Sequence, residues 1–460
     1  MLALGYAGAW GDTIVLKNGH RISASNVVEM ADKIRYETSV GELSLPKSIV
    51  DHIEKGSYVS SMAITPPAMD GVAGGNGGEI ERAVIHGGAI DREYIAKLES
   101  ETRSGSAAAR MDAAVAHHAA ANFELAHGDM DHALADGRTA VMYAPEEPLL
   151  LMDVGYLHLR RSEYRQSLDY LERARRIAPS NPDVAKLSGW AYYGMNKLPQ
   201  AVEQWKRALA LKPDAEVQAA LEKAERDQGE EEGYKENDSA HFTLRYSGNA
   251  EPELAREVLR TLETHYARIN SELNCAPHDS IGVILYTQQA FADVTRAPGW
   301  ADALNDGRLR VPVQGLSSMT DELSRLLKHE LTHTFVEQKT HGRAPTWLQE
   351  GLAQWMEGKR SGEHAEALLE VYGDGHAVSL GSLEGSWMKF QTDEAIYAYA
   401  WALANIEYIV QADGMGDVER ILERIGAGSS TESALRDVLH SDYGDVMRSS
   451  ADYLRRTYSR

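Results

Sequence analysis

Cysteine is nearly absent from this chain of 460 residues, which has a single thiol at Cys275. One thiol excludes an internal disulfide framework and any multi-thiolate metal cluster, so a bound metal must use His and carboxylate ligands. Basic residues are also scarce, because 47 Lys and Arg stand against 69 Asp and Glu and give a net charge of −22. This acidity disfavours a nucleic-acid partner or an anionic membrane surface, since their phosphates attract Lys and Arg.

Long apolar runs are missing as well, and none approaches the ~20 residues that a membrane span needs. The composition, 43% hydrophobic and 25% charged, is that of an ordinary globular chain, and its length predicts two to four folded units. Residues 1–12 are a short apolar stretch in which Ala7-Gly8-Ala9 fits the small-residue pattern of a signal-peptide cleavage site. We therefore expect a leader remnant and export to the periplasm or cell envelope. The alternative is a disordered N-terminus on a cytoplasmic protein.

Residues 13–60 have the pattern of a small β unit. Two β-rich segments flank Asn18-Gly19, the strongest short signal for a hairpin turn. With its later strand over 41–46, the segment resembles the small SH3- or Sm-like β modules that open many bacterial envelope proteins. Residues 61–89 follow with Pro66-Pro67 and with five glycines between Gly71 and Gly78, which predicts a flexible linker.

A repeat of 34 residues runs through the range 90–227. Pro145, Pro179 and Pro213 stand 34 residues apart, and three alanines keep the same spacing. This period is the tetratricopeptide length and predicts units near 114–147, 148–181 and 182–215, with a capping helix over 216–227. A generic helical bundle is the alternative. Such an array presents a concave surface to a protein partner, although it can also serve only as a spacer.

The repeats are followed by an acidic stretch over 228–240 that we interpret as a solvated linker without function. The remaining residues, 241–460, are numerous enough for a catalytic domain.

A helix is predicted over 320–339, because its apolar residues recur at helical spacing and acids occupy its first turn. It contains His329-Glu330-Leu331-Thr332-His333. Histidines at i and i+4 share one face, so both imidazoles can bind one tetrahedral Zn²⁺. Glu330 can then reach the water on the metal without being a ligand. The alternative is a pair of histidines that make only local hydrogen bonds.

A third ligand comes seventeen residues after His333. Glu350 lies within Pro345-Thr346-Trp347-Leu348-Gln349-Glu350-Gly351-Leu352-Ala353, where Pro345 is well placed to begin a second helix. A carboxylate from a neighbouring helix completes the His₂Glu set of a catalytic zinc site and leaves one position for water. The ligands predicted from the sequence are therefore His329, His333 and Glu350.

Together the two motifs resemble the gluzincin metallopeptidases, specifically the bacterial peptidase MA-like domains, over most of 241–460. The resemblance implies an α+β zincin-like domain that hydrolyses peptide bonds with Zn²⁺ and with Glu330 as general base. The fold class expected for the whole chain is therefore a small all-β module, an all-α tetratricopeptide solenoid and this metallopeptidase domain. Peptides or proteins would be the substrates, and the repeats would recruit a substrate or a partner.

The same resemblance implies further site residues. In thermolysin-like relatives a carboxylate four residues after the third ligand supports a zinc histidine, and here that position holds the uncharged Gln354. Residues 306–313 look like the edge strand that pairs with an extended substrate, which assigns Arg310, Val311 and Val313 to substrate binding. The alternative is an ordinary edge strand. Tyr399, which opens a long helix with Ala398-Tyr399-Ala400-Trp401, could donate to the oxyanion or be a core aromatic residue.

Two other functions fit the same residues. The first is a protein-interaction scaffold whose peptidase domain is degenerate and weakly active or inactive. The second is a zinc amidase that uses the same ligands on cell-wall peptides. The intact ligand pattern favours an enzyme, and the sequence alone does not decide between endopeptidase and exopeptidase action.

Overall fold

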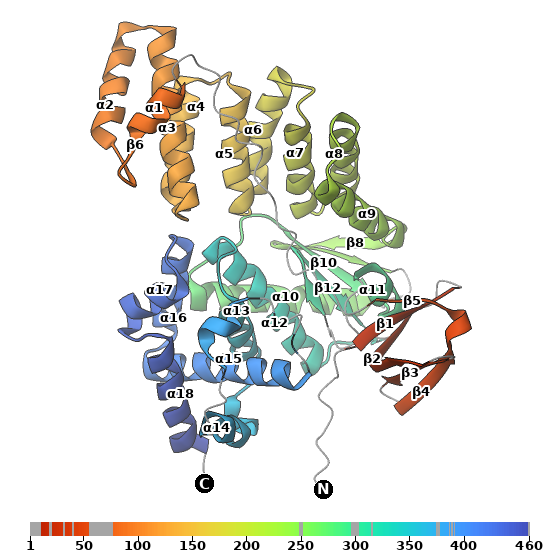
Figure 1. Cartoon of the computed structure of the whole chain (residues 1–460). Coiled ribbons are helices and arrows are strands. Elements are labelled where there is room, and N and C mark those ends of the chain that lie inside the picture. Colours follow the sequence, from red (N-terminus) through yellow and green to blue (C-terminus); the bar gives the residue numbers. More distant parts are fainter. Residues whose placement is uncertain are drawn as a thin grey trace.

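The computed structural model describes residues 11–17, 21–30, 33–38, 41–54, 77–247, 252–295, 303–313, 316–373, 378–385, 387, 390 and 392–458. The described residues form an N-terminal sheet, an arch of paired helices and a C-terminal unit of a sheet and many helices (Figure 1). None of the described helices is both long enough and apolar enough to cross a membrane.

The N-terminal sheet has five antiparallel strands in the order β4-β3-β2-β1-β5. Their bounds are β1 (Gly11–Leu16), β2 (Arg21–Glu29), β3 (Lys33–Thr38), β4 (Gly41–Pro46) and β5 (Val50–Glu54). These strands occupy the range in which the sequence predicts a β unit, and the resemblance to SH3- or Sm-like modules stays a prediction. Residues 1–10 of the predicted leader and the predicted Asn18-Gly19 turn lie outside the described residues.

The predicted linker over 61–89 is too long at its C-terminal end. Residues 55–76 lie outside the described part, but helix α1 (Gly77–Val84) already begins at Gly77. A short hairpin of β6 (Ile85–His86) and β7 (Ala89–Ile90) and helix α2 (Arg92–Glu101) follow it. Ile80 and Val84 are buried in the core of the helical arch. Burial of these side chains stabilises helix α1, although the neighbouring glycines in the sequence predict a flexible segment.

Three helical hairpins follow in the register that the 34-residue period predicts. They are α3 (Ala107–Ala126) with α4 (Met130–Tyr143), α5 (Pro148–Arg160) with α6 (Tyr164–Ile177) and α7 (Pro182–Gly194) with α8 (Leu198–Leu211), and α9 (Ala215–Glu230) closes the array. Glycine is required where paired helices touch. A Cβ on Gly189 would lie 2.3 Å from Trp205 Nε1, and one on Gly155 would lie 2.9 Å from Leu171 Cγ.

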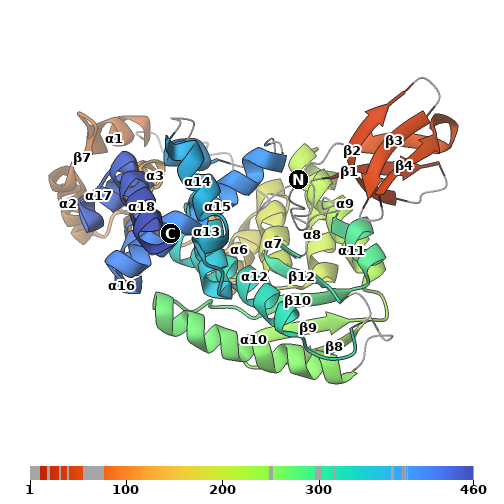
Figure 2. The same cartoon turned by 90° about the horizontal axis from the view of Figure 1, so that it is seen from below.

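The C-terminal unit is built on a five-stranded mixed sheet in the order β11-β12-β10-β9-β8. Its strands are β8 (Lys235–Asp238), β9 (Phe242–Tyr246), β10 (Ile281–Tyr286), β11 (Leu304–Asn305) and β12 (Arg308–Pro312). Strand β10 is parallel to β9 and β12, whereas β8 and β11 are antiparallel to their neighbours. Helices α10 (Pro252–Leu273) and α12 (Asp321–Thr340) contact the sheet, and α11 (Gln288–Thr295) lies against α9 and the sheet (Figure 2).

Six further helices complete the C-terminal unit. They are α13 (Thr346–Glu357), α14 (Ala365–Gly373), α15 (Thr392–Ala412), α16 (Met415–Gly426), α17 (Thr431–Leu439) and α18 (Tyr443–Tyr458). Helix α13 packs between α12 and α15, which joins the two predicted motif helices to the core of the unit. Helix α15 begins at Thr392, before the predicted start at Ala398, and ends at Ala412.

The prediction of a linker over 228–240 is wrong, although most residues of this range are solvent-exposed as predicted. Helix α9 continues to Glu230, and residues 235–238 form edge strand β8 of the sheet. Glu231 lies between these two elements and is only 1% exposed, because its carboxylate is paired with the guanidinium groups of Arg308 and Arg245. An acidic run is usually solvated, and Glu231 is the exception here because arginines from two strands of the sheet pair with it.

Candidate metal centre

Helix α12 carries His329 and His333 on one face, since residues four apart lie one turn from each other. The helix begins after Thr320, whose hydroxyl accepts a hydrogen bond from the backbone N–H of Leu323 at 3.1 Å. Its opposite face is buried in the core of the C-terminal unit through Leu323, Leu327, Leu331 and Phe335. Burial of this face fixes the direction in which the two imidazoles project.

Glu350 reaches the histidines because the chain reverses between α12 and α13. His341 ends α12 in the left-handed conformation with φ of 51°, and Pro345 precedes the first residue of α13. Gly351, directly after Glu350, lies against α15, where a Cβ would stand only 2.4 Å from the carbonyl oxygen of Ala402. This close approach allows α13 to hold Glu350 beside α12.

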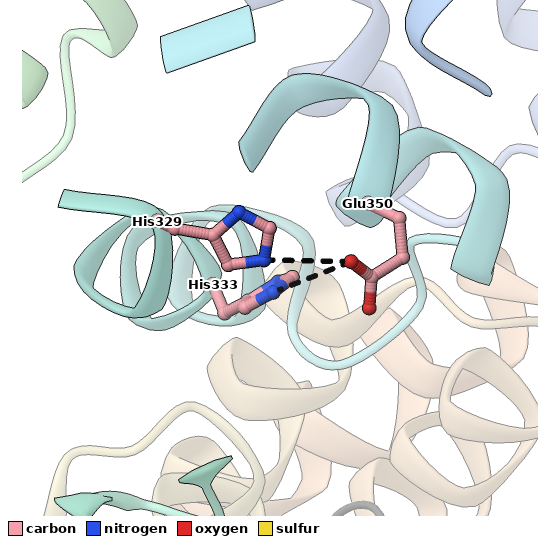
Figure 3. Close-up of side chains that lie close together, drawn as sticks. All are labelled: His329, His333 and Glu350. Atoms are coloured by element: carbon pink, nitrogen blue, oxygen red, sulfur yellow. Dashed lines mark ion pairs between the residues drawn. The ribbon is translucent and has the colours of Figure 1, made fainter. Parts of the chain in front are cut away.

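The three side chains converge on one point (Figure 3). Glu350 Oε2 lies 3.5 Å from His329 Nε2 and 3.8 Å from His333 Nε2, and the two imidazole rings stand nearly perpendicular at 79°. All three ligand atoms lie within 4.8 Å of one another, and in the described part of the chain this is the one such group of three His, Cys, Asp or Glu residues. Each side chain keeps between 15% and 18% of its surface exposed, so the point is open to solvent.

This geometry fits a tetrahedral Zn²⁺. Zinc binds imidazole nitrogen at ~2.0–2.1 Å and carboxylate oxygen at ~2.0–2.2 Å, which places two ligand atoms ~3.4 Å apart at the tetrahedral angle. The separations between Glu350 Oε2 and the two histidine nitrogens, 3.5 and 3.8 Å, need only a few tenths of an ångström of adjustment. Two imidazoles and one carboxylate are also a donor set that zinc prefers.

The three groups differ in how they hold a proton. Burial acts to lower the pKa of His329, but the neighbouring carboxylates of Glu350 and Glu357 outweigh it and raise the pKa to about 10. Burial lowers the pKa of His333 to about 4, against the opposing effect of Glu350. Burial acts to raise the pKa of Glu350, yet the two histidines hold it below its usual value. The carboxylates of Glu350 and Glu357 therefore favour a positive charge at the place where the three side chains converge.

Glu357 supports His329 from the side opposite Glu350. Its Oε1 lies 3.4 Å from His329 Nδ1 and 2.8 Å from Lys359 Nζ, and its side chain is 8% exposed. Sequence reasoning missed this residue, although it lies two helical turns after Glu350 and hence on the same face of α13. A carboxylate beside the second ring nitrogen of a metal-binding histidine fixes the ring orientation and raises its basicity.

The structure gives Gln354 a different contact from the one implied by the resemblance. Its amide nitrogen donates to the backbone carbonyl oxygens of Glu350 at 3.1 Å and Tyr399 at 3.0 Å. Gln354 thus joins α13 to α15, while Glu357 supports His329. The amide group of Gln354 is directed toward α15, where it contacts the backbone of Tyr399.

Glu330 lies next to His329 on α12, and its side chain is largely buried. Its negative charge makes a small contribution to the raised pKa of His329. The backbone carbonyl of Glu330 accepts a hydrogen bond from Asn305 Nδ2 at 2.8 Å, which ties this turn of α12 to strand β11. The residue assigned as general base therefore has a fixed backbone.

Tyr399 lies on α15 and is partly buried. Its ring packs edge-on against Trp387, with ring centroids 4.9 Å apart and an interplanar angle of 84°. This contact is that of a core aromatic residue, which is the alternative that the sequence leaves open, and an oxyanion-donor role stays a prediction.

The strand assigned to substrate binding is not a free edge along its whole length. Strand β11 pairs with β12 at Leu309 and Arg310, and among the described residues no strand pairs with this edge of β12 from Val311 onward. Arg310 is fully buried with its guanidinium paired to Asp306 and Asp227. The backbone of Arg310 is already paired with Leu304 of β11 and Ile284 of β10, so the assignment of Arg310 to substrate binding is wrong. For Val311 and Val313, whose side chains are also buried, pairing of a substrate with the backbone stays a prediction.

Two imidazoles and a carboxylate gathered on facing helices define a candidate centre for a divalent metal ion. Residues 276–454 match the model of the Peptidase MA superfamily, and residues 158–224 match a tetratricopeptide repeat model. The chain thus contains a Peptidase MA superfamily domain that includes α12 and α13, together with tetratricopeptide repeats that include α6 to α8. No curated protein matches the chain.

Proposed function

We propose that this protein is a zinc-dependent peptidase of the gluzincin type, in which His329, His333 and Glu350 hold Zn²⁺. The observation that carries the proposal is the convergence of their three ligand atoms within 4.8 Å, inside the region that matches the Peptidase MA superfamily. The spacing of the ligands, their partial exposure and the carboxylate behind His329 all support a catalytic site that keeps one position open.

Bound zinc would supply a Lewis acid that polarises the scissile carbonyl and lowers the pKa of water. Glu330 would accept a proton from the water that attacks the carbonyl carbon, and the carbon–nitrogen bond would break as Glu330 returns that proton to the leaving amine. Glu357 would keep the His329 ring oriented. Tyr399 is a candidate donor to the oxyanion.

Glu330→Gln tests this assignment, because the amide cannot accept the proton whereas the three ligands remain. We expect full zinc content and a loss of peptide hydrolysis of at least ~100-fold, the lower range for general acid–base catalysis. Glu322→Gln is the matched control, since Glu322 is an exposed acid in the first turn of the same helix. Hydrolysis at the wild-type rate by Glu330→Gln would exclude Glu330 as the base.

The same variants separate peptidase action from the two other functions. Hydrolysis of muropeptides but not of protein substrates by the wild type would show a cell-wall amidase. Zinc-free folded protein without hydrolysis would show a scaffold whose repeats bind a partner, which the match to tetratricopeptide repeats makes a specific alternative. Export to the periplasm or envelope stays a proposal, and cell fractionation tests it.

A further inference from the structure

Strand β12 presents two chemically different faces, both of them buried. Leu309 and Val311 point into the main core with α12, whereas Arg308 and Arg310 alternate with them and point to the opposite face. Both arginine side chains are at most 1% exposed. Buried guanidinium groups must be paired with anions, and the anions here come largely from the tetratricopeptide array.

Helix α9 closes the array and contains Asp227, and Glu231 lies just beyond its last residue. Asp227 accepts hydrogen bonds from Arg310 at 2.8 and 2.7 Å and from Arg308 at 3.2 Å. Glu231 accepts one from Arg308 at 2.8 Å. Tyr193, on α7 of the array, accepts a further bond from Arg310 at 3.0 Å. The sheet and the array thus share one desolvated ionic network.

The network continues into the hairpin that joins β11 to β12. Asp306 in that turn is paired with Lys223 of α9 and accepts hydrogen bonds from Arg310 Nε at 3.0 Å. Asn305 closes the same turn, since its Oδ1 accepts the backbone N–H of Gly307 at 3.1 Å. The position of this hairpin therefore depends on α9.

Asn305 then extends the connection to the candidate site. Its Nδ2 donates to the carbonyl oxygen of Glu330 at 2.8 Å and to Thr334 Oγ1 at 2.7 Å. Both acceptors lie on the turn of α12 that contains the assigned base and a metal ligand. Among the described residues, a continuous series of contacts thus runs from α9 through the hairpin to Glu330.

The array also docks elsewhere on the C-terminal unit. The backbone N–H of Tyr164, at the start of α6, donates to Asp279 Oδ2 at 3.0 Å, and Arg165 pairs with the same carboxylate at 3.2 Å. The turn at Gly128 lies against Gly428, where a Cβ would stand 2.8 Å from backbone atoms. Several contacts along the array fix its orientation, so it is not a module on a flexible tether.

We propose that Asn305 is a positioning residue for Glu330 and that the tetratricopeptide array, through the ionic network on α9, holds Asn305 in place. The array is then a structural part of the catalytic unit as well as a surface for partners. A partner that moves α9 changes the rate of hydrolysis by moving the hairpin. This inference rests on the proposed role of Glu330.

Asn305→Asp in the full chain tests the positioning role. The carboxylate can still accept the N–H of Gly307 and keep the turn, but it cannot donate to the carbonyl of Glu330. We expect kcat to fall at least tenfold, with an unchanged KM and an unchanged zinc content. A wild-type kcat in Asn305→Asp overturns the positioning role. A tenfold change in KM with an unchanged kcat overturns it as well.

Lys223→Met tests the connection to the array at a distance from the site. We expect faster hydrogen exchange of the backbone amides in residues 303–313 and in α12, together with a lower kcat. Lys206→Met is the matched control, because Lys206 forms an exposed ion pair with Glu225 inside the array. Unchanged exchange in Lys223→Met, or the same change in Lys206→Met, overturns the coupling.

The two sets of measurements fail in different ways. If Glu330→Gln hydrolyses peptides as the wild type does, the proposed function is wrong, whereas the exchange measurement on Lys223→Met still decides whether the array holds the hairpin. If Glu330→Gln is inactive and Asn305→Asp is fully active, the proposed function stands and the positioning role is wrong.

Discussion

Asp227→Asn is the variant that should disturb the junction between the array and the sheet most strongly. Asp227 is fully buried, and its two oxygens accept three hydrogen bonds from Arg308 and Arg310. An amide removes the charge and turns two N–H donors toward buried guanidinium groups. Removing one partner from a buried ion pair costs ~3–5 kcal/mol of unfolding free energy. At ~2 °C for each kcal/mol, the melting temperature falls by ~6–10 °C.

Differential scanning calorimetry of the full chain measures this loss. Glu225→Gln is the matched control, because Glu225 is an exposed acid on the same helix and its loss should change the unfolding free energy by no more than ~0.5 kcal/mol. We expect the array and the C-terminal unit to unfold in one transition that moves as a whole. A shift below ~1 kcal/mol, or an earlier transition of the array alone, would refute the shared network.

Two other predictions concern the metal centre directly. Glu357→Gln should weaken zinc binding ~10–100-fold in a competition titration with a chelator, because the amide carries no charge toward His329 Nδ1. Gln354→Ala is the comparison. An equal or larger loss of zinc affinity in Gln354→Ala would contradict the conclusion that Glu357, and not Gln354, supports His329. Gly351→Ala should lower the unfolding free energy by ~1–3 kcal/mol and reduce zinc content, because its Cβ overlaps the carbonyl of Ala402; Gly229→Ala, whose Cβ meets nothing within 4 Å, is the control, and full zinc content in Gly351→Ala would contradict the account.

The parts of this structure that the sequence predicts well depend on local sequence patterns. The spacing of His329 and His333 fixes their common helix face without any knowledge of the rest of the fold. The helical hairpins follow the 34-residue period for the same reason, since each proline and small residue marks a position within its own unit.

The parts that the sequence does not predict depend on contacts between segments that lie far apart in the chain. Arg308 and Arg310 alternate with apolar residues, which is the usual pattern of a strand with one solvated face. The actual partners of that face lie some 80 residues earlier: Asp227, at the end of the predicted capping helix, and Glu231, in the acidic stretch that the sequence places in solvent. Glu357 was missed because the resemblance to thermolysin-like metallopeptidases places the supporting acid at the position of Gln354, and only the packing of α13 on α15 shows which residue faces His329.

Zinc stoichiometry of the full chain is the most direct test of the central claim, because the C-terminal unit shares its buried ionic network with the array and is best measured intact. Inductively coupled plasma mass spectrometry should find about one zinc per wild-type chain. Glu350→Ala and His333→Ala should lose most of it while remaining folded by circular dichroism. A folded wild-type chain without zinc, or equal zinc in all three proteins, would contradict the assignment of His329, His333 and Glu350 as the metal site.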